Sequence, residues 1–303
     1  MYSKHSLVQL LNELNFNPNK DYGQNFLIDR SICETFAQSA TLDPDKDAVL
    51  EIGPGFGQVT EFLIEHCQQL YVIELDKTCA RFLEKKYAHQ YSTARMSGKK
   101  AIQLGDIPAS AHLAIVEGDA LAVPFPHATK IVSSVPYSIC YKLMLKIINT
   151  WNYESVHLIL QKEFVDHILA ETGQPGYTVM AAFAGYYLLG ERLLEIPTES
   201  FYPEPDVQSL IVKFTPKPTI AINTTEAAYR EKYLVFLEGL FPYITWSFTR
   251  AAKTFQEKKP KIAANFQHLT QAVERSEYKD TWIRNIPPEG LFRIMVESLH
   301  YIP

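Results

Sequence analysis

Hydrophobic and polar positions alternate along the chain in a way that predicts strands and helices in turn. From Ala48 the chain reads AVLEI, a run of apolar and β-branched residues that predicts a buried strand. The next segment, QVTEFLIEHCQQ, places Val59, Phe62 and Leu63 on one helix face, so we expect a helix there. Strands and helices that alternate in this way favour a parallel sheet with helices on both faces.

The same alternation continues through most of the chain. Further strands are predicted in QLYVIEL, LAIVE, KIVSSVPY, YESVHLILQ, the end of YTVMAAFAGYYLLGERLLEI, and SLIVKF, and the last two are expected to form an antiparallel hairpin that ends the sheet. The fold class is therefore α/β. Residues 89–112 are polar and contain glycine, and they are longer than the usual connection, so we expect a surface insertion near 90–110.

Beyond about Pro218 the pattern changes to helices only, as in EAAYREKYLVFLEGLF and PPEGLFRIMVESLH. The preceding FTPKP is typical of an exit from a domain. We therefore expect residues 1–217 to form the α/β domain, with an N-terminal helical extension, and residues 218–303 to form a small all-α domain.

Composition restricts the classes of partner and site. With 29 Lys plus Arg against 34 Asp plus Glu, the net charge of −5 argues mildly against nucleic acid, although a local basic patch remains compatible with it. The four cysteines have no CxxC pairing, so we expect neither disulfides nor a metal site. No window of 18 apolar residues occurs, so we expect no membrane segment and a cytoplasmic protein.

A glycine turn follows the first predicted strand and opens a helix, in the sequence Gly53-Pro54-Gly55-Phe56-Gly57. Glycines let a backbone approach a ligand closely at such a place. The spacing G-x-G-x-G differs from the dinucleotide pattern G-x-G-x-x-G, which favours the nucleoside end of S-adenosylmethionine over NAD.

Carboxylates stand at the ends of the next two predicted strands. Glu74 is suited to the ribose hydroxyls and Asp119 to the adenine amino group, since ligands of open parallel sheets bind at the carboxyl ends of the strands. A lone acid in such a place also occurs as a helix cap or in solvent. Asp76 is a competing ribose ligand, but we expect it to cap the helix that begins at Lys77 or Thr78.

Several motifs together resemble the ribosomal RNA adenine dimethyltransferase family. In chain order they are GQNFL (23–27), LEIGPGFG (50–57), VIELD (72–76), VEGDAL (116–121), VPY (135–137), QKE (161–163) and FYPEPDVQS (201–209). The resemblance weakens after about residue 217. It implies a Rossmann-like S-adenosylmethionine-dependent methyltransferase domain followed by a helical RNA-binding domain.

The resemblance also implies roles for individual residues. Cofactor binding would fall to Gln24, Asn25 and Leu27, which close over the methionine part, to the backbone of Gly53 and Gly55, to Glu74 and Asp119, and to Ser134. The implied reaction is methylation of adenosine N6 near the 3′ end of small-subunit ribosomal RNA, or in one branch of large-subunit RNA. The implied partner is a small ribosomal subunit precursor, bound by a monomer.

The implied catalytic residues are Ser134, Pro136 and Tyr137, which match the N-x-P-Y motif of amino-methyltransferases with serine in the place of asparagine. In that motif the asparagine and a backbone carbonyl accept hydrogen bonds from the amine, and the aromatic ring stacks on the base. A serine is shorter and has no amide. Three interpretations follow: retained adenine methylation, a different target amine, or a cofactor fold that binds RNA with little catalysis.

The serine pair has a simpler interpretation as well. Pro136 would end a strand, and Ser133 or Ser134 would cap the helix that follows. Within the family interpretation, Ser133 is a strand residue with no special role.

The helical region holds the best candidate for a phosphate-binding face. Its basic residues are Arg250, Lys253, Lys258, Lys259 and Lys261, interleaved with Trp246, Phe248 and Phe255. The alternative is a solvated helix end whose aromatic rings belong to the core.

Overall fold

The computed structural model describes residues 3–19, 23–97, 110–218 and 229–300. Within them the chain forms two compact units. The first comprises Met1–Lys162 and Glu191–Thr215, and the second comprises Glu163–Gly190 and Pro216–Pro303. Residues 163–190 thus group with the helical part of the chain, and the expected domains 1–217 and 218–303 remain a prediction.

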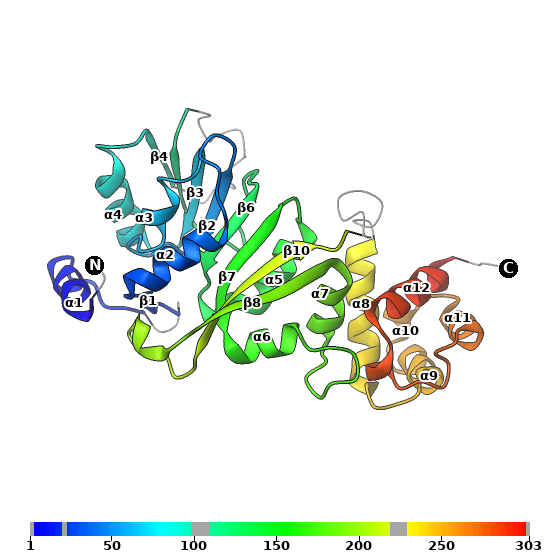
Figure 1. Ribbon diagram of the computed structural model, residues 1–303. Coiled ribbons are helices and arrows are strands. Elements are labelled where there is room, and N and C mark those ends of the chain that lie inside the picture. The colour runs from blue at the N-terminus through cyan, green and yellow to red at the C-terminus, as the bar shows by residue number, and fades with distance from the viewer. Residues whose placement is uncertain (1–2, 20–22, 98–109, 219–228, 301–303) are drawn as a thin grey trace. The chain divides into compact units, whose positions relative to one another are not determined.

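The main sheet is mixed and has the strand order β4-β5-β3-β2-β6-β7-β10-β8 (Figure 1). Neighbouring strands from β4 to β7 run parallel, whereas β10 runs antiparallel to β7. The α/β class is therefore confirmed, and so is the expectation that β8 and β10 end the sheet side by side. The strands are β2 Ala48–Ile52, β3 Gln69–Glu74, β4 Thr93–Ser97, β5 Leu113–Glu117, β6 Lys130–Ser134, β7 Ser155–Gln161, β8 Leu188–Ile196 and β10 Ser209–Pro216.

Helices connect these strands and form the second unit. In chain order they are α1 Lys4–Glu13, α2 Arg30–Ser39, α3 Thr60–Leu63, α4 Lys77–Tyr87, α5 Cys140–Asn149, α6 Lys162–Ile168, α7 Val179–Tyr187, α8 Arg230–Leu240, α9 Phe248–Lys258, α10 Pro260–Ala263, α11 Leu269–Arg275 and α12 Pro288–Leu299. A separate two-stranded sheet pairs β1, Phe26–Leu27, with β9, Phe201–Tyr202.

Two local predictions differ in part from the structure. Part of the expected insertion is the edge strand β4, which pairs with β5 and is held by the ion pairs of Arg95 with Glu84 and Glu117; residues 98–109 lie outside the described chain. The helix expected in QVTEFLIEHCQQ is the short α3. It ends early because the amides of Gln68 and Gln69 bond to the carbonyl of Asp47, which draws the chain back to the sheet.

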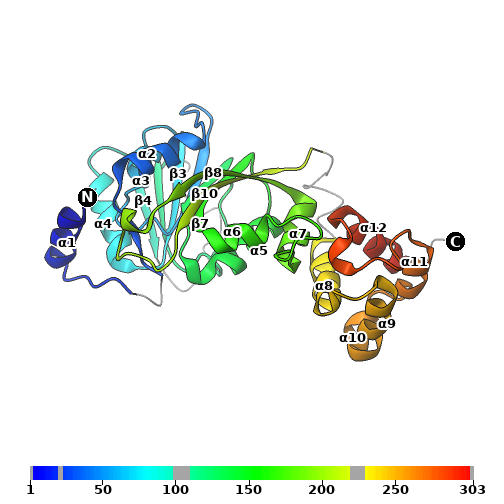
Figure 2. The same ribbon diagram turned by 60° about the horizontal axis from the view of Figure 1, so that its bottom comes forward.

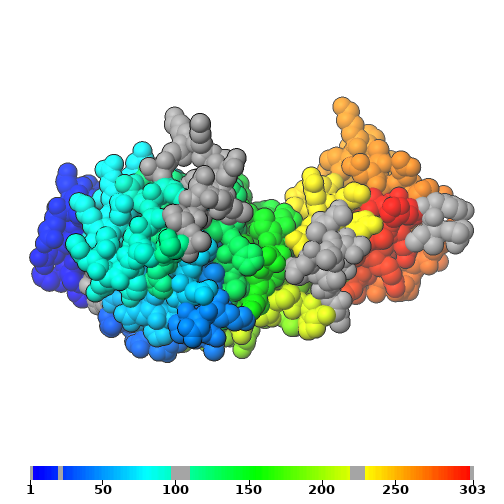
Figure 3. Space-filling view, turned by 90° about the horizontal axis from the view of Figure 1, so that it is seen from above, coloured from blue at the N-terminus to red at the C-terminus, as the bar shows by residue number. Residues whose placement is uncertain are grey.

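A small apolar cluster joins α1 to the glycine turn. Leu7 and Leu11 of α1 are buried against Phe26, Phe56 and Cys79. The Phe56 ring is fully buried and lies in contact with the rings of Phe16, Phe26 and Phe82. Figures 2 and 3 show α1 next to α4, with its dark blue residues against the cyan ones. The turn between β2 and α3 is therefore fixed from outside by a packed aromatic cluster.

In the second unit, α8 and α9 pack closely at one glycine. A Cβ on Gly239 would lie 2.4 Å from the Phe255 ring, which is fully buried and packs against Phe266. Overpacking costs typically about 1–3 kcal/mol, more than the ~1 kcal/mol that alanine gains over glycine in a helix.

We therefore expect Gly239→Ala to destabilise the second unit by about 1–2 kcal/mol, measured by chemical denaturation. Gly185→Ala is the matched control, because its Cβ would meet Pro288 at an ordinary 3.6 Å. Equal stability of the two variants would contradict the packing seen at Gly239.

Candidate active site

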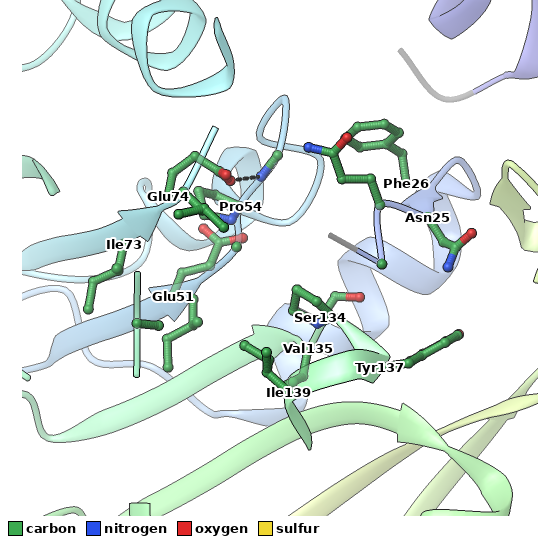
Figure 4. A pocket seen from close by; sticks show the side chains of 18 of the residues that line it. Asn25, Phe26, Glu51, Pro54, Ile73, Glu74, Ser134, Val135, Tyr137 and Ile139 are labelled. Atoms are coloured by element: carbon green, nitrogen blue, oxygen red, sulfur yellow. Dashed lines mark hydrogen bonds between the residues drawn. The ribbon is translucent and has the colours of Figure 1, made fainter. Parts of the chain in front are cut away.

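A pocket lies at the carboxyl ends of β2, β3, β5 and β6 (Figure 4). Parallel strands present their ends at one edge of a sheet, which is why groups from separate motifs meet there. The lining includes every residue expected in cofactor binding or catalysis: Gln24, Asn25, Leu27, Gly53, Gly55, Glu74, Asp119, Ser134, Pro136 and Tyr137. In Figure 4, Glu51 and Glu74 lie on one side of the pocket and Val135 and Tyr137 on another.

The glycine turn requires glycine for two separate reasons. Gly53 and Gly55 have φ angles of +66° and +57°, in the left-handed region that other residues rarely adopt. A Cβ on Gly55 would also lie 2.9 Å from the Phe26 ring, whereas one on Gly53 would meet the Pro136 ring at an ordinary 3.4 Å. The backbone therefore forms the pocket wall directly, without an intervening side chain.

Glu74 is buried at the end of β3 and is held by two backbone amides. Its Oε2 accepts a hydrogen bond from the Gly55 N–H at 3.0 Å, and its Oε1 accepts one from the Asp76 N–H at 2.7 Å. Burial raises its pKa to about 7, although the hydrogen bonds from these amides act in the opposite direction. Asp76 caps α4 by accepting from the amides of Thr78 and Cys79, as expected.

Sequence reasoning missed a second buried carboxyl in the pocket. Glu51 of β2 is 2% exposed and accepts a hydrogen bond from the Thr60 hydroxyl at 2.7 Å. Burial raises its pKa to about 8; the Thr60 hydrogen bond acts in the opposite direction, and the nearby charge of Glu74 in the same direction as burial. Its place two residues before Gly53 was the only available signal.

The loop after β5 is fixed by a lysine that the sequence did not single out. Asp119 is exposed, and its Oδ1 accepts from the Leu121 N–H at 2.8 Å. The Lys146 ammonium donates to the carbonyls of Ala120, at 2.7 Å, and Val123. Burial lowers the pKa of Lys146, while the charge of Asp119 raises it. Lys146 therefore holds the segment that carries Asp119.

The interpretation of Ser133 or Ser134 as a helix cap does not agree with the structure. The hydroxyl of Ser133 is buried and donates to the Ile52 carbonyl at 2.6 Å, so this residue ties β6 to the end of β2 beside the glycine turn. The expectation that Ser133 has no special role was wrong, because the sequence does not show which strand lies beside it. The 3₁₀ turn Tyr137–Ile139 has no side-chain cap from either serine.

Ser134 is half-buried and lines the pocket. Among the described residues, no hydrogen-bond partner is recorded for its hydroxyl. Its position is fixed through the backbone, since Ser134 pairs with Ile159 of β7 and the following Val135 N–H bonds to the Ile159 carbonyl at 3.2 Å. An acceptor therefore stands in the pocket on a rigid strand end.

Two aromatic side chains border the same region. Tyr137 lines the pocket and Phe201, a residue that sequence reasoning did not select, lines it from β9. Phe201 pairs with Leu27 of β1. Its signal in the sequence was its place as the first residue of the loop FYPEPDVQS.

The N-terminal segment GQNFL borders the pocket as expected, with one qualification about Gln24. The side-chain oxygen of Gln24 accepts a hydrogen bond from the Asn19 N–H at 2.8 Å, so it stabilises its own loop. Gly23 approaches Pro136 and Tyr137, and a Cβ there would lie 3.2 Å from the Tyr137 nitrogen. This segment therefore packs on the turn that follows β6.

The basic residues of the second unit lie on α9, on α10 and between them. Arg250, Lys253, Lys258 and Lys261 are exposed, and Lys259 is half-buried. The Arg250 guanidinium stacks 3.8 Å from the centre of the Trp246 ring. Phe248 and Phe255 are fully buried, so these two rings belong to the core, as in the alternative interpretation. The segment coloured orange, which contains α10, projects from the surface (Figure 3).

Comparison with known proteins agrees with the motifs. The family model described as ribosomal RNA adenine dimethylase matches residues 15–241. The ribosomal RNA small subunit methyltransferase A of Dechloromonas aromatica is 34% identical over 67% of this chain and 73% of that protein. The protein of the same name from Chromobacterium violaceum is 31% identical over 91% of this chain and 94% of that one.

A solved structure supports the fold independently. The dimethyladenosine transferase of Plasmodium falciparum superposes with a TM-score of 0.73, covering 88% of this chain and 94% of that one at 20% sequence identity. The resemblance found in the motifs is therefore confirmed over most of the chain. This chain belongs to the ribosomal RNA adenine dimethylase family.

Proposed function

We propose that this protein is an S-adenosylmethionine-dependent methyltransferase that methylates adenosine N6 in ribosomal RNA, with the 3′ end of the small-subunit RNA as its target. The observation that carries the proposal is the meeting, in one pocket, of the glycine turn, Glu74 and Asp119 with the Ser134–Tyr137 segment. The first group suits a nucleoside, and the second suits an amine on a base.

The pocket residues fit S-adenosylmethionine. Gly53 and Gly55 place bare backbone on the pocket wall, at φ angles that other residues rarely adopt, and Glu74 is a buried acceptor at a strand end. A carboxylate there matches the two ribose hydroxyls, since it has acceptor capacity beyond its two amide bonds. Asp119 would accept from the adenine amine. When bound, S-adenosylmethionine supplies a methyl group carried on a positively charged sulfur.

The residues at the end of β6 and just after it hold the target amine. Its nitrogen is a weak nucleophile because its lone pair is delocalised into the ring, so acceptors must polarise its N–H bonds. The Ser134 hydroxyl and the Val135 carbonyl provide two such acceptors. Tyr137 provides a ring face for a base taken out of its stack. In this scheme the rate enhancement comes from positioning the amine and the methyl group. The scheme uses neither a metal ion nor a covalent enzyme intermediate.

Transfer of labelled methyl groups tests the proposal. Purified protein is incubated with labelled S-adenosylmethionine and unmodified small ribosomal subunits, with large subunits as the comparison. We expect label in N6-methylated adenosine of the small-subunit RNA. Tight cofactor binding without any transfer to RNA would contradict the enzymatic proposal and favour a binding or assembly factor.

No helix in the described parts of the chain is long and apolar enough to cross a membrane.

We propose that the protein acts in the cytoplasm as a monomer on a small ribosomal subunit precursor. Its RNA contacts would include Arg250, Lys253, Lys258, Lys259 and Lys261, because a cluster of mostly exposed cations suits phosphates, and the Arg250–Trp246 stack suits a base.

The double variant Arg250→Ala/Lys253→Ala is expected to weaken RNA binding about tenfold at low salt. The slope of log affinity against log salt concentration is expected to become shallower, by the amount that corresponds to about one lost phosphate contact for each residue replaced. Filter binding at several salt concentrations measures both effects. Lys232→Ala, which removes an exposed lysine of α8, is the control. An unchanged salt slope in the double variant would show that this face does not meet phosphates.

A further inference from the structure

A hydrogen bond joins Tyr137 to a residue distant in the sequence. The phenol oxygen of Tyr137 lies 2.6 Å from the hydroxyl oxygen of Ser209, the first residue of β10. Tyr137 lines the pocket, whereas Ser209 does not and is fully buried. The bond therefore links the pocket wall to the sheet behind it.

The sheet makes Ser209 a rigid anchor. Ser209 pairs with Gln161 of β7, and the Lys162 N–H bonds to the neighbouring Gln208 carbonyl at 2.9 Å. A serine side chain has one χ angle that places its oxygen, so little freedom remains once the strand is paired. The hydroxyl is thus presented to Tyr137 from a fixed position.

The bond fixes the direction of the tyrosine ring. At one end the ring is attached to backbone that follows Pro136, and at the other its hydroxyl is held by Ser209. The Cβ atom and the hydroxyl oxygen lie at the two ends of the long axis of the ring. Because both are held, χ1 is defined and the ring is kept in the pocket. Burial raises the pKa of Tyr137, and its hydrogen bond to Ser209 acts in the opposite direction.

The loop between Phe201 and Ser209 relates this ring to another. Phe201 lines the pocket at the start of the loop, and Ser209 holds Tyr137 at its end. Both ends are buried, while residues 206–208 between them are exposed. One short segment therefore sets the places of two aromatic side chains that border the pocket.

The chemistry of Ser209 also needs an explanation. Burying a hydroxyl destabilises a fold unless it is hydrogen-bonded, so alanine would be the simpler residue at a fully buried strand position. Tyr137 is the one partner recorded for this hydroxyl among the described residues. The serine is thus accounted for by what it does to the tyrosine.

We propose that Ser209 is a positioning residue for the target base: its hydroxyl holds Tyr137 so that the ring face is ready to stack on that base. This inference rests on the proposed methyltransferase function. It concerns the RNA substrate, so loss of the bond changes methyl transfer to RNA and leaves cofactor binding unchanged.

The bond can be removed from either side, which gives a sharp test. Ser209→Ala and Tyr137→Phe are each expected to lower kcat/KM for methyl transfer to unmodified small subunits by about three- to tenfold, the range for one neutral hydrogen bond. The double variant is expected to be no worse than either single one, since all three lack the same bond. Calorimetry is expected to give the wild-type affinity for S-adenosylmethionine in each.

Two further variants separate positioning from stability. Ser155→Ala removes another buried serine hydroxyl of the sheet, bonded to His157, and is expected to leave kinetics unchanged. Ser209→Thr keeps a hydroxyl and is expected to restore most of the activity lost in Ser209→Ala. Tyr137→Phe leaves the buried position 209 intact, so it reports on the bond even if Ser209→Ala unfolds.

The outcomes distinguish the two proposals. If the wild type is active, three results would overturn the role of Ser209 alone. These are additive losses of activity in the double variant, full activity in Tyr137→Phe, and altered cofactor affinity in either single variant. A wild type that binds S-adenosylmethionine and methylates no ribosomal RNA would overturn the proposed function and this inference with it.

Discussion

Replacing Glu74 with glutamine is expected to weaken S-adenosylmethionine binding about 30- to 100-fold at pH 8, because two hydrogen bonds from ribose hydroxyls would lose a charged acceptor. Hydrogen bonds to charged groups contribute about 1.5–3 kcal/mol, against about 0.5–1.5 kcal/mol for neutral ones. The NH2 group of the glutamine would also face the N–H of Gly55 or of Asp76, each of which donates a hydrogen bond to the carboxylate of Glu74. Isothermal titration calorimetry measures the change.

Asp76→Asn is the matched control for this experiment. Asp76 lies two residues away and was the competing ribose ligand, but its carboxylate is engaged in capping α4. Asparagine caps a helix about as well as aspartate, so the fold is retained. We expect nearly wild-type affinity, and a larger loss in Asp76→Asn than in Glu74→Gln would reverse the assignment.

The pH dependence of binding gives a second measure of the same role. The pKa of Glu74 is raised to about 7 by burial, so the carboxyl of the ligand-free protein takes up a proton as pH falls through 7. If the ribose bonds to the ionised form, binding must release that proton, and affinity falls about tenfold for each pH unit below 7. Above that range the affinity is constant.

Variants assign this pH effect to one of two neighbouring carboxyls. Glu74→Gln is expected to abolish the dependence near pH 7, whereas Glu51→Gln is expected to keep it, because the Thr60 hydroxyl can still donate to the glutamine oxygen. Affinity of the wild type that is unchanged or rises on acidification would contradict the ribose role of Glu74.

The sequence predicted most of the fold because its hydrophobic periodicity is strong in the buried strands. AVLEI and LAIVE are nearly continuous apolar runs, and such runs are typical of strands covered on both faces. The strand β4 was missed because TARMS has no such run and lies at the edge, where pairing with β5 supplies the order. Local pattern could not show that pairing.

The site was predictable where it depends on strand ends. Glu74, Asp119 and Ser134 come from separate motifs, and the geometry of a parallel sheet alone brings them to one edge. Burial and side-chain partners were not predictable in the same way. Glu51 and Lys146 became visible only once the sheet and the loop after β5 were placed.

Ser209 shows most clearly what the sequence could not reveal. It lies 72 positions from Tyr137 and reaches it because β10 is inserted next to β7, out of chain order. The expected hairpin of β8 and β10 did not specify which of the two would pair with β7. The contact depends on that choice and on the register that opposes Ser209 to Gln161.

Replacing Ser134 with asparagine is expected to raise the rate of methyl transfer by about 10²–10³, the amount that one preorganised acceptor contributes in other enzymes. Ser134 lines the pocket, and no hydrogen-bond partner of its hydroxyl is recorded among the described residues. The strand end cannot move to shorten the reach, since both the pairing of Ser134 with Ile159 and the Val135 N–H bond hold it. Asparagine extends the acceptor by one heavy atom from the same backbone.

Single-turnover transfer of labelled methyl groups to unmodified small subunits measures this effect. Calorimetry of S-adenosylmethionine binding, run alongside, separates a gain in the transfer rate from any change in cofactor affinity. Ser138→Asn is the matched control, because Ser138 also lines the pocket but is exposed and follows the Tyr137 ring. Ser134→Ala removes the acceptor and is expected to be slower than the wild type.

The opposite result would change the assignment of the substrate. If Ser134→Asn is slower than the wild type while Ser134→Ala is inactive, the serine is the acceptor that this site requires, and the target amine differs from adenosine N6. Mass spectrometry of the nucleosides from the methylated RNA then identifies the amine. Because Pro136 and Tyr137 keep their places in either case, the change would lie in the single acceptor at position 134 and in the base that it selects.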